Sequence, residues 1–285
     1  MVDQRYLIVV FTNALGVFTL ATHTIGMYLL YTVTHFPANQ RLILMNLSCV
    51  EMLIVLMNFF TVTGMSFPFN PFLQEMVILF EMYALCATWN GVMVFLTLNR
   101  FFEIYYHLKY PLKLTKRKTK WILGSFWIFG LVYFTVILVL RLKFKFDALT
   151  FLQTVAIPAF EIPTIIISIA AYSYIYKVLR RSRKLTRTMR TRTGTFVPFW
   201  IVVTYIIFIC GPQAIVVVLF YHMKIPKVGH PMYPIGAVLF VVGFLSDVII
   251  YIFLNERLRR NLVKLFKTGQ KRVDEDVSYV IHSLS

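Results

Sequence analysis

The sequence predicts an all-α fold: a seven-transmembrane helix bundle with a short amphipathic surface helix after the seventh span. Three observations lead to this fold class. Apolar stretches fill almost the whole chain, the composition is strongly hydrophobic, and the Lys and Arg residues are concentrated between alternate stretches. Together they exclude an ordinary soluble domain.

The apolar stretches are the first observation. Runs without any Lys or Arg extend over residues 6–34, 42–67, 76–99, 121–140, 148–176, 193–221 and 231–254. Each run is long enough to span a membrane, because ~20 helical residues cross a hydrocarbon core of ~30 Å. Hydrophobic residues make up 59% of the chain, charged residues only 14%, and the mean hydropathy is +0.72.

The basic residues are sorted to one side of these runs. If successive connections alternate between the two sides, one side holds Arg41 and the basic segments 100–120, 177–192 and 257–272. The other side holds only Arg5, Arg141, Lys143, Lys145, Lys224 and Lys227. Short basic loops stay in the cytoplasm, so we expect an extracellular N-terminus and a cytoplasmic C-terminus. This sorting and the attraction of membrane lipids account for the net charge of +17, and we expect no nucleic-acid partner.

The chain is predicted to form one transmembrane domain, residues 1–255, and a cytoplasmic tail, residues 256–285. The tail opens with a predicted amphipathic helix over residues 256–267, which would lie on the membrane surface. Its apolar residues recur at helical spacing beside a basic face; they are Leu258, Leu262, Leu265 and Phe266.

The predicted outer loops are short and carry no cysteine. They cover residues 68–72, 141–147 and 223–230. We expect no cleavable signal peptide, because no charged segment and small-residue cleavage site accompany the first run. We also expect no extracellular disulfide and no palmitoylated tail, because all three cysteines fall inside predicted spans. These are Cys49, Cys86 and Cys210.

Polar residues inside the spans are the candidate functional residues, because each is costly in lipid unless it faces protein or water. The acids are Glu51, Glu81, Glu161 and Asp247, and they are accompanied by His23, Trp89 and Asn90. Each acid can equally be a protonated carboxyl group that is hydrogen-bonded inside the bundle. For Glu161, between Pro158 and Pro163, the broken backbone pairing beside the prolines is a further structural explanation.

Several short motifs occur in a fixed order along the spans. They are Asn99-Arg100-Phe101 at the end of the third span with Tyr110-Pro111 after it, residues 46–51 with Glu51 in the second, Trp127 in the fourth, Pro163 in the fifth, Cys210-Gly211-Pro212 in the sixth, and Asp247 to Tyr251 in the seventh. In this order the chain resembles the rhodopsin-like (class A) G protein-coupled receptors, over nearly its whole length, as a divergent member.

The resemblance implies a plasma-membrane receptor, not an enzyme, that signals from an extracellular ligand to a heterotrimeric G protein. It implies roles in coupling and activation for Asn99, Arg100, Phe101, Glu103, Tyr172 and Tyr251. It implies a hinge in the sixth helix at Cys210 and Pro212, and an intramembrane polar network of His23, Glu51, Trp89, Asn90 and Asp247. It places a ligand pocket near Glu81, Met82, Cys86 and Glu161.

The departures from the family pattern are equally specific. Asn99 stands where an acid normally neighbours the arginine, and the region of the sixth-helix acid has the sequence Thr191-Arg192-Thr193. Arg100 therefore lacks both usual partners, although Glu103 lies on a neighbouring helix face and can pair with it. Other departures are Glu51 in place of Asp, Cys210 in place of the sixth-helix tryptophan, and Val248 in place of the seventh-helix proline.

The ligand is expected to be a small molecule, a lipid or a short peptide, because the outer segments are too short to hold a folded protein. Met82 stands where amine receptors carry an Asp, and Glu81 points about 100° away in a regular helix, which argues against an amine. The seventh span has no Lys for a retinal Schiff base, so no cofactor is expected.

A metal is not required, although Na⁺ at Glu51 and Asp247 is one possibility. Trp89 occupies the position of a small hydroxyl ligand of such a site. A proton shared by the two acids, or an ion pair with His23, is therefore favoured over Na⁺.

Two other functions stay open. Glu51, Asp247 and His23 are the groups that a proton- or cation-coupled transporter or channel needs. The odd number of spans, the absence of an internal repeat and the basic inner loops argue against it. A receptor-like protein that no longer signals and acts by pairing with other receptors is the third possibility.

Overall fold

The computed structural model describes residues 4–32, 38–66, 70–106, 114–145, 151, 155, 157–181, 197–212, 232–256 and 258–265. These residues are almost entirely helical, and no β-strand occurs among them. The all-α part of the predicted fold class is therefore confirmed.

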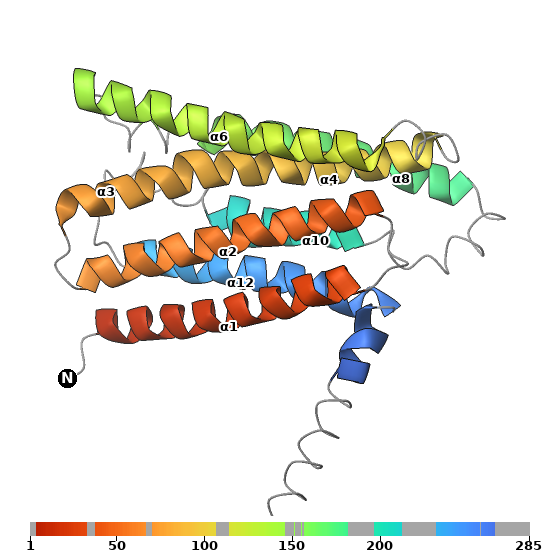
Figure 1. Ribbon diagram of the computed structural model, residues 1–285, viewed down its shortest axis with the longest axis horizontal. Coiled ribbons are helices and arrows are strands. Elements are labelled where there is room, and N and C mark those ends of the chain that lie inside the picture. Colours follow the sequence, from red (N-terminus) through yellow and green to blue (C-terminus); the bar gives the residue numbers. More distant parts are fainter. Residues whose placement is uncertain are drawn as a thin grey trace, which may run out of the picture.

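The helices form long rods that run back and forth through the bundle (Figure 1). The third rod consists of two α-helices joined by a π-helix, and the sixth consists of an α-helix followed directly by a π-helix. In chain order the elements are α1 (Gln4–Thr32), α2 (Ala38–Ser66), α3 (Pro71–Leu79), η1 (Phe80–Leu85), α4 (Cys86–Tyr106), α6 (Lys116–Phe144), α8 (Ile157–Arg181), α10 (Val197–Tyr205), η5 (Ile206–Cys210) and α12 (Met232–Phe253).

Five helical stretches of the described residues are long and apolar enough to cross a membrane. They are Val9–Thr32, Ala38–Thr63, Phe72–Tyr106, Lys116–Phe144 and Ala159–Val178. Val238–Phe253 and Leu258–Leu265, bent by 95° to each other, form a sixth candidate if they are taken as one span, and Phe199–Cys210 is a shorter apolar helix. These lengths indicate a multi-pass membrane protein, and seven crossings stay a prediction.

The helices extend beyond several of the predicted spans. The helix α4 continues through Arg100 to Tyr106, and α6 begins at Lys116. Two predicted outer loops are partly wrong, because residues 71–72 belong to α3 and residues 141–144 belong to α6. A run without basic residues marks the lipid core, whereas a helix can continue into the interface, where long basic side chains reach water. The predicted outer loop 223–230 lies outside the described residues.

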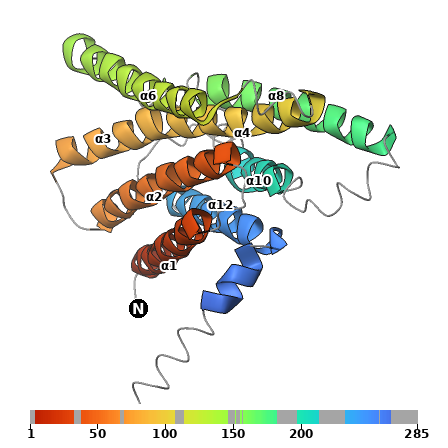
Figure 2. The ribbon, with the colours of Figure 1, turned by 45° about the vertical axis from the view of Figure 1, so that its right-hand side comes forward.

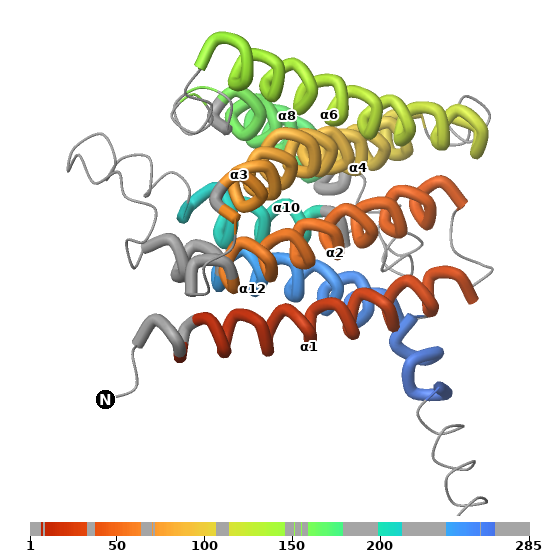
Figure 3. Tube along the Cα trace, turned by 60° about the vertical axis from the view of Figure 1, so that its left-hand side comes forward, coloured from red at the N-terminus to blue at the C-terminus, as the bar shows by residue number. Residues whose placement is uncertain are grey.

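The bundle has α1 at one edge and α6 at the other, with the remaining helices between them (Figures 1 and 2). The helix α1 packs on α2 and α12, α4 packs on α2, α6 and α8, and α10 packs on α12 (Figure 3). The largest fully buried side chains lie at the centre, among them Trp89, Tyr205, Tyr251 and Phe244. Large apolar side chains on α6, such as Trp121 and Phe129, are exposed and would face lipid.

Two glycines allow unusually close contacts between helices. A Cβ atom built on Gly26 of α1 would lie 2.0 Å from the Tyr251 hydroxyl oxygen. A Cβ atom on Gly130 of α6 would lie 2.5 Å from the backbone oxygen of Ala84 in η1. The missing side chains therefore let α12 reach α1, and let α6 reach the π-helical part of the third rod.

A short helix turns away from the end of α12 (Figure 1). Its start is capped by Asn255, whose Oδ1 accepts a hydrogen bond from the backbone nitrogen of Leu258 at 3.4 Å. Leu258 is buried and Leu262 packs against the core, while Arg259 and Lys264 are exposed. Over Leu258–Leu265 this is the helix that the spacing predicts; residues 257, 266 and 267 lie outside the described residues.

Candidate functional site

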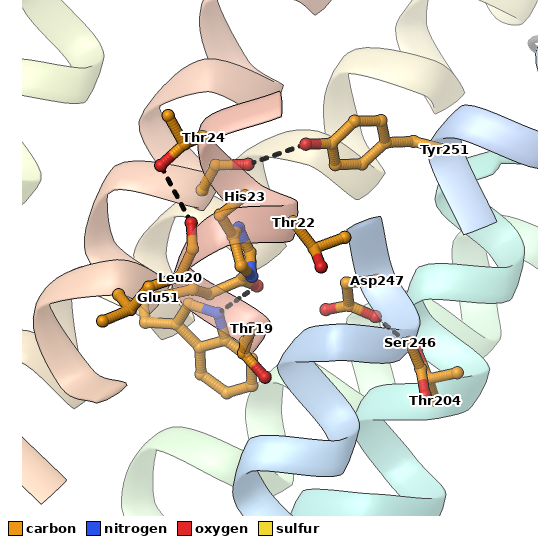
Figure 4. Close-up of polar contacts among 12 residues, drawn as sticks. Thr19, Leu20, Thr22, His23, Thr24, Glu51, Thr204, Ser246, Asp247 and Tyr251 are labelled. Carbon is orange, nitrogen blue, oxygen red and sulfur yellow. Dashed lines mark hydrogen bonds and ion pairs between the residues drawn. The ribbon is translucent and has the colours of Figure 1, made fainter. Parts of the chain in front are cut away.

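The middle of the bundle contains a buried polar network that joins α1, α2, α4 and α12 (Figure 4). The Nε2 atom of His23 lies 3.7 Å from Oε2 of Glu51. The indole nitrogen of Trp89 donates a hydrogen bond to Oε1 of Glu51 at 3.1 Å. His23, Glu51, Trp89 and Asp247 are each at most 2% exposed. The structure therefore brings together four of the five residues of the predicted network.

Glu51 and Asp247 come from different helices, and their carboxyl groups lie within reach of each other. Asp247 Oδ1 accepts a hydrogen bond from the hydroxyl group of Thr204 on α10 at 2.5 Å. Two adjacent carboxylates are unfavourable in a low dielectric unless a proton or a cation compensates them. The base in contact with this pair is His23, so a shared proton or a His23–Glu51 ion pair is the chemistry that the arrangement can support.

The network also holds buried atoms whose hydrogen bonds are not satisfied. Among the described residues, neither ring nitrogen of His23 nor Oε2 of Glu51 forms a hydrogen bond of good geometry, although the backbone of Phe244 lies near His23 and the Asp247 carboxyl group lies near Glu51. On its other side Glu51 meets the N–H group of Trp89, which is a donor and cannot bind a cation. No group of three or more His, Cys, Asp or Glu side chains in the described part of the chain is placed to hold a metal ion.

Asn90, the fifth residue of the predicted network, faces other partners than its neighbour Trp89. Its Oδ1 accepts one hydrogen bond from the hydroxyl group of Tyr205 on α10, at 2.9 Å, and another from the hydroxyl group of Thr164 on α8, at 3.3 Å. Its Nδ2 donates to the backbone oxygen of Cys86 at 2.9 Å. Asn90 thus connects α4 to α8 and α10, and Trp89 connects α4 to α2.

Three of the four predicted pocket residues interact with one another, and the fourth, Met82, packs in an apolar cluster. Cys86 interacts electrostatically with both Glu81 and Glu161, which places both acids near it. Glu81 is 4% exposed and accepts a hydrogen bond from Thr61 of α2 at 3.4 Å. Met82 instead packs against the apolar cluster around Tyr83. Its place in the predicted pocket stays a prediction.

The π-helix η1 changes the directions in which the side chains of this segment point. Residues 80–85 form wider turns than an α-helix, so the angles between neighbouring side chains differ from those of a regular helix. The residue pattern does not predict this change, because π-helical turns are short and have no simple spacing rule.

Arg100 lies at the far end of α4 and pairs with Glu103. Its Nη1 atom donates a hydrogen bond to Oε2 of Glu103 at 2.6 Å, and the Arg100 side chain is 7% exposed. Tyr172 of α8 lies near enough to interact electrostatically with Arg100. Phe101 contacts Tyr174 of α8, with ring centroids 5.2 Å apart. The pairing of Arg100 with Glu103 that the spacing allowed is present.

Asn99 and Tyr251, the other predicted coupling residues, are also buried. The Tyr251 hydroxyl group lies 3.2 Å from the hydroxyl group of Ser48 on α2, and either can be the donor. Tyr251 therefore contacts α1 and α2, at Gly26 and Ser48.

The predicted hinge in the sixth helix coincides with the π-helix η5. Cys210 is its last residue and is buried, and Pro212 follows it two residues later. Proline has no N–H group to donate to the preceding turn, which is a usual cause of a local change in helix geometry. The far side of the hinge lies outside the described residues.

Sequence analysis missed the hydroxyl groups that complete the network. Thr164, Thr204 and Tyr205 contact predicted network residues, and Ser48 contacts the predicted coupling residue Tyr251. Thr204 and Tyr205 form a polar pair inside the sixth apolar run, and this pair was the available signal.

Comparison with known proteins adds no relative. The chain matches no protein-family model and no curated protein.

Proposed function

We propose that this chain is a rhodopsin-like G protein-coupled receptor, which passes an extracellular ligand signal to a heterotrimeric G protein. The observation that carries the proposal is the buried polar network of Glu51, Asp247, Trp89 and His23, which joins four helices across the middle of the bundle. A network of this kind is costly to bury, so it is more easily explained by a function than by stability alone.

Such a network can convert a small ligand contact into a change of helix packing. Its members belong to separate helices, and each contact has a narrow range of favourable geometry. A ligand that binds one arrangement more tightly than another therefore shifts the population of two bundle packings. We propose that the ligand, a small molecule, a lipid or a short peptide, binds near Cys86, Glu81 and Glu161.

The proposed G-protein surface is the basic end of the bundle. Arg100 is there, paired with Glu103 and near Tyr172, and the aromatic contact between Phe101 and Tyr174 joins α4 to α8. The stretches 100–120 and 177–192, at this end of α4 and α8, hold seven and eight Lys or Arg residues, which favours a cytoplasmic position for this end. The plasma membrane is the proposed location, with the N-terminus outside.

The test is expression in cells that carry second-messenger reporters, with parallel lines that lack individual classes of G protein. We expect a reporter signal above that of mock-transfected cells, and its loss when the coupled G protein is absent. Arg100→Gln should remove the signal while surface expression stays unchanged. Arg260→Gln is the matched control, because that side chain is 73% exposed on the helix after α12.

A second candidate is a proton- or cation-coupled transporter or channel. The specific observation in its favour is that His23, Glu51 and Asp247 are buried together and contain atoms without hydrogen bonds of good geometry. A current or a proton flux that depends on Glu51, in cells without any G-protein signal, would favour this candidate over the receptor. The absence of both a reporter signal and a current or flux would instead favour a non-signalling partner of other receptors.

A further inference from the structure

Two consecutive residues of α10 bind two different helices. Thr204 donates a hydrogen bond to Asp247 of α12 at 2.5 Å, and Tyr205 donates one to Asn90 of α4 at 2.9 Å. Both side chains are buried, Thr204 at 9% and Tyr205 at 1% exposed. Successive residues of a helix point about 100° apart, so this pair is suited to hold α10 in the corner between its two neighbours.

A second pair of consecutive residues faces this one. Trp89 and Asn90 of α4 also point in different directions, Asn90 to Tyr205 and Trp89 to Glu51. The Trp89 ring packs edge-to-face against Tyr205, with centroids 4.9 Å apart. The two pairs are thus in contact both through a hydrogen bond and through their aromatic rings.

The contacts form a closed ring. Glu51 accepts a hydrogen bond from Trp89, and Asn90, the residue after Trp89, accepts one from Tyr205. Thr204, the residue before Tyr205, donates a hydrogen bond to Asp247, whose carboxyl group lies beside that of Glu51. Four helices take part: α2, α4, α10 and α12. The helix α10 therefore cannot move away from α4 and α12 without breaking two buried hydrogen bonds at once.

The backbone next to this pair has an unusual geometry. The π-helix η5 begins at Ile206, directly after Tyr205, and ends at Cys210, two residues before Pro212. The part of the rod that carries the pair thus ends where the helix changes its turn width. A change of helix geometry can act as a hinge, so that the helical segment before it moves while the segment after it stays packed.

We propose that Thr204 and Tyr205 form a two-point latch, which holds α10 against α4 and α12 and sets the balance between a packed and a displaced α10. The effect of this latch on signalling rests on the proposed receptor function; its effect on the position of α10 does not.

The experiment measures the distance between spin labels on α4 and α10. Labels at Tyr106→Cys and Trp200→Cys lie near the same end of these helices, at side chains that are at least 36% exposed. The exposed native cysteine is replaced by Cys49→Ser. The full chain is placed in lipid nanodiscs, and pulsed electron spin resonance gives the distance distribution.

The test variants each remove one hydroxyl group. Thr204→Val and Tyr205→Phe should each raise the ratio of displaced to packed α10 by about three- to tenfold, the usual net effect of one hydrogen bond. Thr204→Ser keeps a hydroxyl group and should restore the packed distance. The control variants are Thr135→Val and Tyr28→Phe, whose side chains are exposed on α6 and α1.

The possible outcomes separate the latch from the receptor. A longer distance together with raised basal reporter signal supports both. A longer distance without any reporter signal supports the latch and counts against the proposed function. A distance distribution unchanged in both test variants, as in the controls, overturns the latch, and so does a Thr204→Ser variant that behaves like Thr204→Val.

Discussion

Gly26→Ala should destabilise the bundle, because the added methyl group has no room. The built Cβ atom lies 2.0 Å from the hydroxyl oxygen of Tyr251 and 2.9 Å from the ring carbon that carries it. Tyr251 is 2% exposed and its hydroxyl group contacts Ser48, so its ring cannot move into solvent. Either α1 or α12 has to shift.

The size of the effect follows from two opposing contributions. Overpacking a close contact costs about 1–3 kcal/mol. Replacing glycine by alanine in a helix gains about 0.5–1 kcal/mol. The expected net loss of unfolding free energy is therefore about 0–2.5 kcal/mol, with a midpoint of about 1 kcal/mol. Tyr251→Phe removes the oxygen atom nearest to the added Cβ atom, so in the double variant the loss should be smaller than the sum of the two single losses.

The chain contains a matched control. Gly124 lies on α6, and a Cβ atom built there meets no atom within 4 Å. Gly124→Ala should therefore keep the helix gain without the clash and be neutral or slightly stabilising. Gly130→Ala should be at least as damaging as Gly26→Ala, because its Cβ atom would meet the backbone oxygen of Ala84 at 2.5 Å.

The assay is reversible unfolding of the purified protein in mixed micelles by increasing dodecyl sulfate, followed by circular dichroism. If Gly26→Ala unfolds at the same denaturant fraction as Gly124→Ala, the close contact of α1 with Tyr251 is refuted. Strict additivity with Tyr251→Phe would assign the loss to another cause than this contact.

Three further predictions concern orientation, restraint and the buried acids. An N-terminal tag should be accessible to antibody on intact cells and a C-terminal tag only after permeabilisation; surface labelling of the C-terminus would contradict the orientation drawn from the basic loops. The natural protein should show ligand-independent reporter signal, and Asn99→Asp should lower it, because a carboxylate next to Arg100 attracts the guanidinium group; an absent basal signal that the variant leaves unchanged would refute this. Glu51→Gln and Asp247→Asn should shift signalling in the same direction with surface expression largely intact, and their combination should deviate from additivity by about 0.5–3 kcal/mol, since each relieves the same repulsion; additive effects, or a Na⁺ dependence of ligand affinity that either change abolishes, would exclude the shared proton.

Much of the helical architecture could be predicted from the sequence, because the membrane restricts what a chain can do. Backbone groups in lipid must be paired within each segment, so a long apolar run becomes a helix whatever its neighbours are. The rarity of polar residues in such runs also made Glu51, Asp247, His23 and Trp89 visible as candidates before their contacts were known.

The residue pattern was thus sufficient to predict the all-helical class, the approximate positions of the helices and the side chains that are costly to bury. The tertiary structure alone decided which of them meet. The contacts from Glu51 to Trp89 and from Thr204 to Asp247 join residues 38 and 43 positions apart. The π-helix η1 sets the directions of Glu81 and Met82, and the π-helix η5 begins directly after Tyr205. Residue spacing along the chain determines only the local periodicity of a helix. Contacts between helices depend on backbone register and on close approaches such as that of Gly26 to Tyr251, and these arise only when the whole bundle is packed.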